Sequence, residues 1–83
     1  MNTTTKARPA IEMTPVKSSQ LAKVGYDKDS QTLAIEFHGG SVYHYANFTP
    51  EDNAALMGAE SLGSHFIRKI KPQTERFPYT RIH

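Results

Sequence analysis

Apolar and polar side chains alternate along residues 32–37. The apolar positions of this stretch are Leu33, Ile35 and Phe37. A period of two is typical of a β-strand with one buried face. Residues 42–45, with the sequence VYHY, are rich in branched and aromatic side chains and predict a second strand. The pair Gly39-Gly40 lies between them and tolerates the positive φ that a two-residue hairpin turn requires. The pattern therefore predicts a β-hairpin.

The length of this connection decides which side of the sheet Tyr43 and Tyr45 occupy. With a two-residue turn, Glu36 pairs with Tyr43, and both tyrosines lie on the face opposite the apolar stripe. A bulge near Gly40 would shift the pairing by one residue and place the tyrosines over the core, because a one-residue slip exchanges the two faces. The tyrosines are therefore either an exposed platform or part of the core, and the sequence leaves both registers open.

A further strand is predicted before the hairpin. Residues 21–26 carry three apolar side chains in imperfect alternation, and Gly25 marks a bulge or a close approach of another chain segment. The polar residues 27–31 predict a turn that connects this strand to the hairpin. The three strands together predict an antiparallel meander.

Two short helices are predicted after the hairpin. Thr49 is expected to cap the first, because a proline and two acidic residues follow it. The second is expected to open at Ser61 or Ser64 and to run to Lys71, because Pro72 ends it. Its apolar stripe, which is expected to face the sheet, consists of Leu62, Phe66 and Ile70, with Ile67 beside them.

The two ends of the chain differ in character. Residues 1–14 are rich in Thr and show no period, which predicts a flexible N-terminal arm. The other end is aromatic, and Phe77, Tyr79 and Ile82 are expected to dock across the domain in an extended conformation.

We therefore predict one α+β domain over residues 15–83. It consists of a three-stranded antiparallel meander packed on two short helices, with an extended C-terminal segment.

Composition limits the class of protein. With 83 residues the core is small, and a dimer or a bound partner would help to stabilise it. The chain contains no Cys, which excludes disulfides and thiolate metal ligands. No apolar run approaches the roughly 18 residues of a membrane span, and the N-terminus lacks the apolar segment of a secretory signal. We expect a cytoplasmic protein that makes no use of a membrane.

Charge is distributed unevenly along the chain. The net charge is +2, but residues 1–23 carry +3, residues 24–63 carry −5 and residues 64–83 carry +4. Two interpretations are open: the basic ends pair with the acidic middle, or they present a basic surface to phosphates.

Several short stretches together resemble the KTSC family. This family comprises domains of about this size, found alone in small bacterial and phage proteins and at the C-terminus of some lysyl-tRNA synthetases. The matching pieces are Ser18-Ser19, Val24-Gly25-Tyr26-Asp27, the strand Thr32–Phe37, Gly40-Ser41-Val42-Tyr43-His44-Tyr45 with its Tyr-x-Tyr, Phe66, Arg68, Ile70, Phe77-Pro78-Tyr79 and Arg81. The resemblance covers roughly residues 16–82, and its association with a tRNA synthetase implies contact with RNA.

The expected function is a noncatalytic binding module for RNA or another nucleotide ligand. Such binding needs aromatic faces for bases and cations for phosphates. The residues assigned to this site are Tyr43, Tyr45, Arg68, Lys69, Lys71, Arg76 and Arg81. The alternative is a protein-interaction module, either a homodimer that pairs through an exposed strand edge or a phage-type effector that binds a host protein.

Catalysis has little support in the sequence. The side chains that titrate near neutral pH are His38, His44, His65 and His83, and none stands in an HExxH motif or another recognisable catalytic spacing. We expect no enzymatic activity, no cofactor and no metal site.

Overall fold

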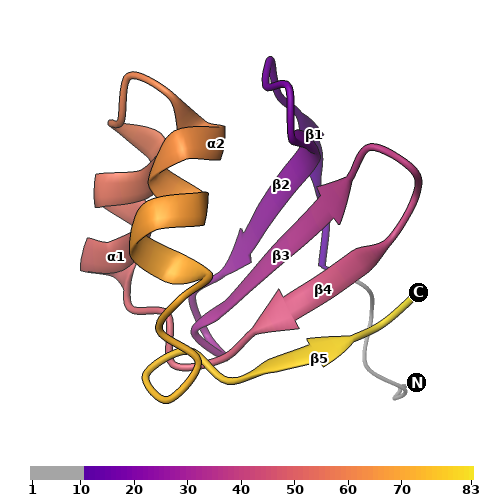
Figure 1. The fold of residues 1–83 in the computed structure, drawn as a ribbon. Helices are drawn as coiled ribbons and strands as arrows, with labels where there is room; N and C mark the ends of the chain where they lie inside the picture. Colours follow the sequence, from indigo (N-terminus) through magenta and orange to yellow (C-terminus); the bar gives the residue numbers. More distant parts are fainter. Residues whose placement is uncertain (1–10) are drawn as a thin grey trace.

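The computed structural model describes residues 11–83 and shows a small α+β fold, in which two helices cover one face of a five-stranded antiparallel sheet (Figure 1). The strand order is β1-β2-β3-β4-β5. The elements are β1 (Thr14–Pro15), β2 (Leu21–Asp27), β3 (Thr32–Phe37), β4 (Val42–Tyr45), α1 (Pro50–Met57), α2 (Leu62–His65), η1 (Phe66–Ile70) and β5 (Tyr79–Arg81). Residues 1–10, the larger part of the predicted arm, lie outside the described residues.

The sheet has five strands, so the prediction of three was incomplete. The predicted meander is present as β2, β3 and β4. The additional strands, β1 and β5, lie at the two edges and contain two and three residues. Strands of this length are too short to show the alternation on which a sequence prediction depends. Because β1 begins at Thr14, the sheet also includes the last residue of the segment predicted as an arm.

The β3–β4 hairpin is confirmed, but its loop has three residues rather than two. The amide of Phe37 donates to the carbonyl of Ser41 at 2.9 Å, and the amide of Gly40 donates to the carbonyl of Phe37 at 3.0 Å. Gly39 and Gly40 have φ of 109° and 97°, a region that glycine adopts without a Cβ clash. The pair was therefore correctly identified as the turn, and the loop around it is one residue longer than expected.

The longer loop places both strand tyrosines on the face that the helices cover. Ile35 lies opposite Tyr43, and Leu33 lies opposite Tyr45. Directly opposed residues of an antiparallel pair project from the same side, so the tyrosines join the apolar stripe of β3. The two-residue turn and the tyrosine platform on the opposite face are therefore wrong, and the shifted register is the one observed.

The predicted starts of both helices are confirmed. The Thr49 hydroxyl accepts from the amide of Asp52 at 3.1 Å, and the Asp52 carboxylate accepts from the amide of Thr49 at 3.0 Å, which completes a capping box. Ser61 caps α2, which continues as a π-helical turn, η1, that ends at Ile70, one residue before the predicted end at Lys71. Within residues 11–83 no helix is long and apolar enough to cross a bilayer.

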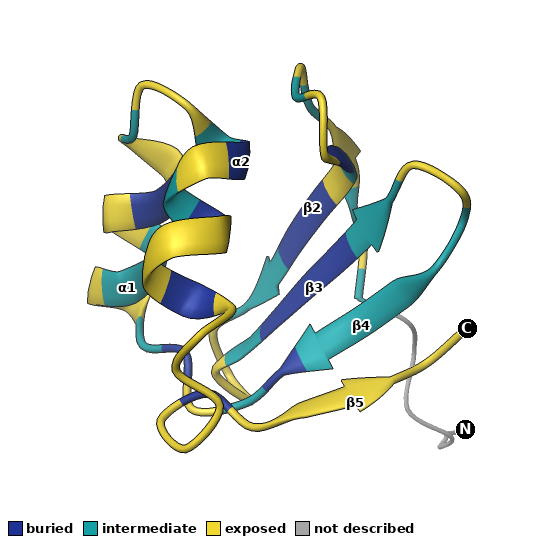
Figure 2. Cartoon of the chain, viewed as in Figure 1, coloured by how far each residue is buried: buried dark blue, intermediate teal, exposed yellow. Residues whose placement is uncertain are grey.

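The core lies between the helices and the sheet, where the strands are most deeply buried (Figure 2). Its largest fully buried side chains are Phe48, Phe66, Leu21, Leu33, Ile35 and Leu56. From the C-terminal segment Phe77 is buried as predicted, whereas Tyr79 and Ile82 each remain 53% exposed. The segment is extended, but it adds a strand at the edge of the sheet instead of covering the core.

Gly25 permits a close approach of the chain that precedes β2. A Cβ at this position would collide with the carbonyl oxygen of Glu12. The close approach predicted for Gly25 is therefore present, and the irregularity of the β2–β3 pairing lies between Leu21 and Lys23 instead.

Candidate functional site

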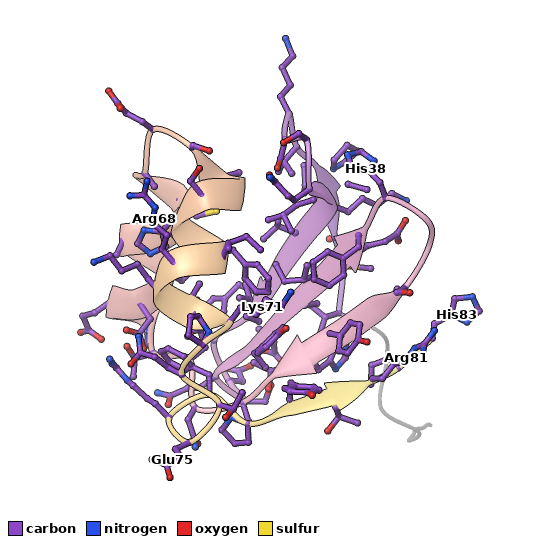
Figure 3. The ribbon with its side chains drawn as sticks, viewed as in Figure 1. His38, Arg68, Lys71, Glu75, Arg81 and His83 are labelled. Atoms are coloured by element: carbon purple, nitrogen blue, oxygen red, sulfur yellow. The ribbon has the colours of Figure 1, made fainter. Side chains whose placement is uncertain are left out.

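A groove of about 430 Å³ lies between the outer strands and the segment that follows η1. It is lined by Phe37, Ser41, Tyr43, Tyr45, Lys71, Thr74 and Tyr79. The strand residues reach it because the β3–β4 register turns the tyrosines toward the helices, and Lys71 reaches it from the end of η1 (Figure 3). Among the described residues, the lining includes one cation, Lys71, and no carboxylate.

The aromatic rings of the groove are packed against one another at tilted angles. The centroid of the Tyr79 ring lies 5.6 Å from that of Tyr43 and 5.7 Å from that of Tyr45, with interplanar angles of 63° and 46°. Tyr45 in turn contacts Phe66 of the core at 5.3 Å. Rings already in contact at these angles form a continuous floor and leave no slot between parallel rings. A flat ligand would therefore lie on the floor.

The three tyrosines differ in how much surface they offer. Tyr45 is 4% exposed, Tyr43 is partly buried and Tyr79 is 53% exposed. Of the three, Tyr79 offers the largest free aromatic face. Tyr45, assigned to ligand stacking from the sequence, instead supports the other two rings from below.

The Tyr45 phenol at the base of the floor is neutral at physiological pH. Burial raises the pKa of Tyr45 to about 12, and the neighbouring Tyr43 and Tyr79 add to the shift. The phenol keeps its proton and can donate a hydrogen bond. The hydroxyls of Ser41 and Thr74 line the same groove and provide further donors and acceptors.

Two of the five predicted cations lie at or next to this groove. Lys71 lines it directly. Arg81 lies opposite Tyr43 on β5, hence on the same side of the sheet, and its Nε donates to the carbonyl of His83 at 3.2 Å. Together they provide positive charge at two positions around the aromatic floor.

The other three cations lie elsewhere, so the predicted cluster is divided. Arg76 forms an ion pair with Asp52 at 3.0 Å, and its guanidinium carbon lies 4.8 Å from the centroid of the Phe77 ring. Arg68 and Lys69 belong to η1, and Figure 3 shows Arg68 on the helices, far from the labelled Arg81. One short helix turn cannot direct all of its basic side chains toward the same groove.

The histidines and carboxylates of the described chain do not gather into a metal site. No group of three or more such side chains within residues 11–83 is placed to hold a metal ion. His38 has a structural contact, because its Nε2 lies 2.8 Å from the carbonyl oxygen of Ser18.

Four residues of the groove were not predicted from the sequence: Phe37, Ser41, Thr74 and Tyr79. Tyr79 had a signal in the aromatic-Pro-Tyr sequence of the tail, which was assigned only to docking. Ser41 and Thr74 carried no signal, because hydroxyl residues in loops are common and their neighbours depend on the fold.

Comparison with known proteins identifies the family. The family model of the KTSC domain matches residues 17–73. The chain belongs to the KTSC domain family. The match includes Tyr43, Tyr45 and Lys71, and it ends before β5, so the KTSC model does not cover Tyr79 or Arg81.

Relatives of this KTSC domain occur alone and within a larger protein. An uncharacterised protein of Stutzerimonas stutzeri is 44% identical over 62 residues, which are 75% of this chain and 87% of that protein. A protein of Tsukamurella paurometabola is 41% identical, over 74% of this chain and 91% of its own length. A lysine–tRNA ligase of Nostoc punctiforme is 37% identical over 75% of this chain, but the match spans 11% of that protein.

The same fold occurs in a solved structure. A KTSC domain protein from Yersinia pestis, known from its crystal structure, is 32% identical and superimposes with a TM-score of 0.77. The similarity covers 89% of this chain and all of that one. The fold described above is therefore that of the KTSC family.

Proposed function

We propose that this KTSC domain is a noncatalytic binding module for RNA or a nucleotide ligand, and that the ligand occupies the aromatic groove. The observation that carries the proposal is the combination in one groove of an exposed tyrosine ring, neutral hydroxyls and a single lysine. A nucleotide combines a flat aromatic base with an anionic phosphate, and these are the two groups that such a lining would bind.

In this arrangement the base lies on the free face of Tyr79. Stacking of a base on an aromatic side chain contributes about 1–3 kcal/mol. Tyr43 borders the base, and Tyr45 holds both rings in place from the core side. Lys71 contacts a phosphate, and Arg81 provides a second positive charge along β5.

One relative supports the proposal by association. The lysine–tRNA ligase of Nostoc punctiforme contains a segment similar to this domain, and its name concerns the attachment of lysine to tRNA. A shared fold does not determine a shared ligand, so the weight of the proposal rests on the groove.

The test is fluorescence-anisotropy titration of a labelled single-stranded RNA with the wild type and with Tyr79→Ala. Loss of about 1–3 kcal/mol of stacking lowers the affinity by roughly 5-fold to 150-fold. Thermal unfolding should change little, because Tyr79 is already 53% exposed to solvent.

Met57→Ala is a matched control, since Met57 is also 53% exposed and lies on α1, away from the groove. It should leave the affinity unchanged. Equal affinities for the wild type and Tyr79→Ala, or an equal loss with both variants, would overturn the proposed site.

A further inference from the structure

The outer edge of β5 carries a regular set of backbone groups directed away from the sheet. The amide of Ile82 donates to the carbonyl of Val42 at 2.7 Å, and the amide of Ala46 donates to the carbonyl of Pro78 at 2.8 Å. Hydrogen-bonding directions alternate along an antiparallel strand. Pro78, Thr80 and Ile82 therefore direct their backbone groups toward β4. The amides and carbonyls of the alternate residues, Tyr79 and Arg81, point outward.

This edge is uncovered among the described residues. The sheet order ends at β5, and all three of its residues are exposed, as Figures 1 and 2 show. Tyr79 and Ile82, both 53% exposed, place two large apolar side chains in or next to the strand. Natural proteins usually protect such an edge with a charge, a proline or a covering segment. Here the protection within β5 is limited to Arg81.

We propose that β5 pairs with β5 of a second copy of this chain, in antiparallel orientation and centred on Thr80. This centring makes residues 79 and 81 of one copy exchange backbone hydrogen bonds with residues 81 and 79 of the other. In this register every outward-pointing amide and carbonyl of residues 79 and 81 lies opposite a partner on the other strand. The five-stranded sheets then join into one continuous sheet.

The side chains of β5 favour this occupant over an unrelated strand. In the centred register Tyr79 of each copy lies directly opposite Arg81 of the other, on the helix-covered side of the sheet. A guanidinium over a tyrosine ring is an attractive pair, and two-fold symmetry produces it twice. The edge is therefore complementary to itself.

The pairing also changes the aromatic groove, and this consequence rests on the proposed function. Arg81 of the second copy is brought beside Tyr79. A base that stacks on the free face of Tyr79 takes the place of this guanidinium, which stays at the edge of the groove as a cation in addition to Lys71. Both grooves then lie on the same side of the joined sheet, because directly opposed residues share a face. A single strand of nucleic acid could contact the two grooves in succession.

The association is expected to be weak. It uses two residues of backbone from each copy and a few side chains, which is well below the roughly 1,200 Å² of buried surface found in stable complexes. Dimerisation should therefore depend on concentration, with monomers at about 10 µM and dimers appearing toward about 1 mM.

Two measurements on the full chain test the proposal. Sedimentation velocity over this concentration range should show a shift from monomer to dimer. Amide hydrogen exchange should slow at Tyr79 and Arg81 by about twofold when half of the chains are paired. The amide of Thr80, which faces β4, should be protected at every concentration.

Arg81→Pro is the deciding variant. It removes an outward amide and the guanidinium but none of the hydrogen bonds between β4 and β5, and proline is tolerated on the free side of an edge strand. The variant should remain monomeric at every concentration while the Thr80 amide keeps its protection, which shows that β5 has stayed in place. Arg68→Gln, which removes one positive charge on η1, is the control and should still dimerise.

The outcomes separate this inference from the proposed function. A wild type that stays monomeric at about 1 mM, or a dimer that persists in Arg81→Pro, would overturn pairing through β5. The second result would assign the contact to another surface. Dimerisation without RNA binding would support the pairing through β5 and contradict the proposed function. RNA binding by a protein that stays monomeric would support the proposed function and contradict the pairing.

Discussion

Tyr43 lies directly opposite Ile35 in the β3–β4 pair, and this pairing turns the tyrosine toward the helices. The neighbouring pair, Leu33 and Tyr45, follows the same register. One extra residue in the glycine loop is responsible, since it reverses the face on which every side chain of β4 lies. The aromatic groove exists because of this shift, and its consequences can be measured.

Removal of the Tyr45 ring should destabilise the fold. Tyr45 is 4% exposed and contacts Phe66, so Tyr45→Ala leaves a cavity in the core. Loss of a buried aromatic ring typically costs about 3–5 kcal/mol. Urea denaturation followed by circular dichroism measures the change. Tyr79→Ala, which removes an exposed ring, is the control and should cost less than about 1 kcal/mol. Equal losses for the two variants would contradict the burial described.

Stability should fall in alkaline solution because of Tyr45. Burial raises its pKa from 10.0 to about 12 in the folded state, so the unfolded chain ionises first. The contribution is fully present below pH 10 and is lost as the pH rises toward about 12. Its size is about 2–3 kcal/mol, at 1.36 kcal/mol per pKa unit. Urea denaturation at pH 8 and at pH values approaching 12 provides the comparison.

Tyr45→Phe is the control for this pH dependence. It retains the ring and removes the titrating hydroxyl, so its stability should decline less over the same interval. Tyr26 also has a raised pKa, because of burial and the nearby carboxylates of Asp52, Glu51 and Asp27. Its ionisation accounts for a part of the loss of stability that should persist in Tyr45→Phe. An identical pH dependence of the wild type and Tyr45→Phe would refute the assignment.

The hairpin loop should not accept a Cβ at Gly39. Its φ of 109° is a conformation that side chains other than glycine rarely adopt, so Gly39→Ala should cost about 1–3 kcal/mol. Gly39→Asn should cost less, because Asn tolerates positive φ better than Ala does. Thermal denaturation of the two variants ranks them. A stability of Gly39→Ala equal to that of the wild type would mean that the loop is free to adopt another turn.

The N-terminus of α1 depends on the Thr49 hydroxyl. Thr49→Ala removes the acceptor for the Asp52 amide and should destabilise the domain by about 1 kcal/mol. Thr49→Ser keeps the hydroxyl and should be close to the wild type. Chemical denaturation distinguishes the two. If both variants lose the same stability, the methyl group and not the capping bond is responsible.

The salt dependence of RNA binding should report the number of phosphates contacted. Two contacts, through Lys71 and Arg81, predict a slope of about −1.4 in a plot of log affinity against log salt, since each contact on a single strand contributes about −0.7. Lys71→Gln should reduce the slope by one contact. Arg68→Gln, on the helices, should leave it unchanged. If the slope is steeper than about −1.4 and Arg68→Gln also reduces it, the RNA must contact phosphate-binding residues on the helices as well.

Much of the local structure was predictable from particular residues. The alternation of Leu33, Ile35 and Phe37 predicted β3, and the threonine, proline and acidic residues around Thr49 predicted the start of α1. Pro72 predicted the end of the second helix. The resemblance to the KTSC family was confirmed as well. These features depend on contacts between residues close in sequence, whose preferences a chain displays directly.

The edges of the sheet and the groove could not be predicted in the same way. β1 and β5 are too short to carry a periodic signal. The groove joins Lys71 and Tyr79 to strand residues more than 25 positions earlier, and such neighbours are set by the packing of the helices on the sheet.

The amino-acid sequence alone determined the elements of the central meander, the helix boundaries and the glycine turn, because these follow from periodicity, capping and backbone freedom. The tertiary structure decided which face of β4 carries the tyrosines, which strands complete the sheet and which cations lie beside the aromatic rings. The physical reason is that a shift of one residue costs little in local preference, while it exchanges buried and exposed faces. The packing of Tyr45 against Phe66 in the core favours the observed register.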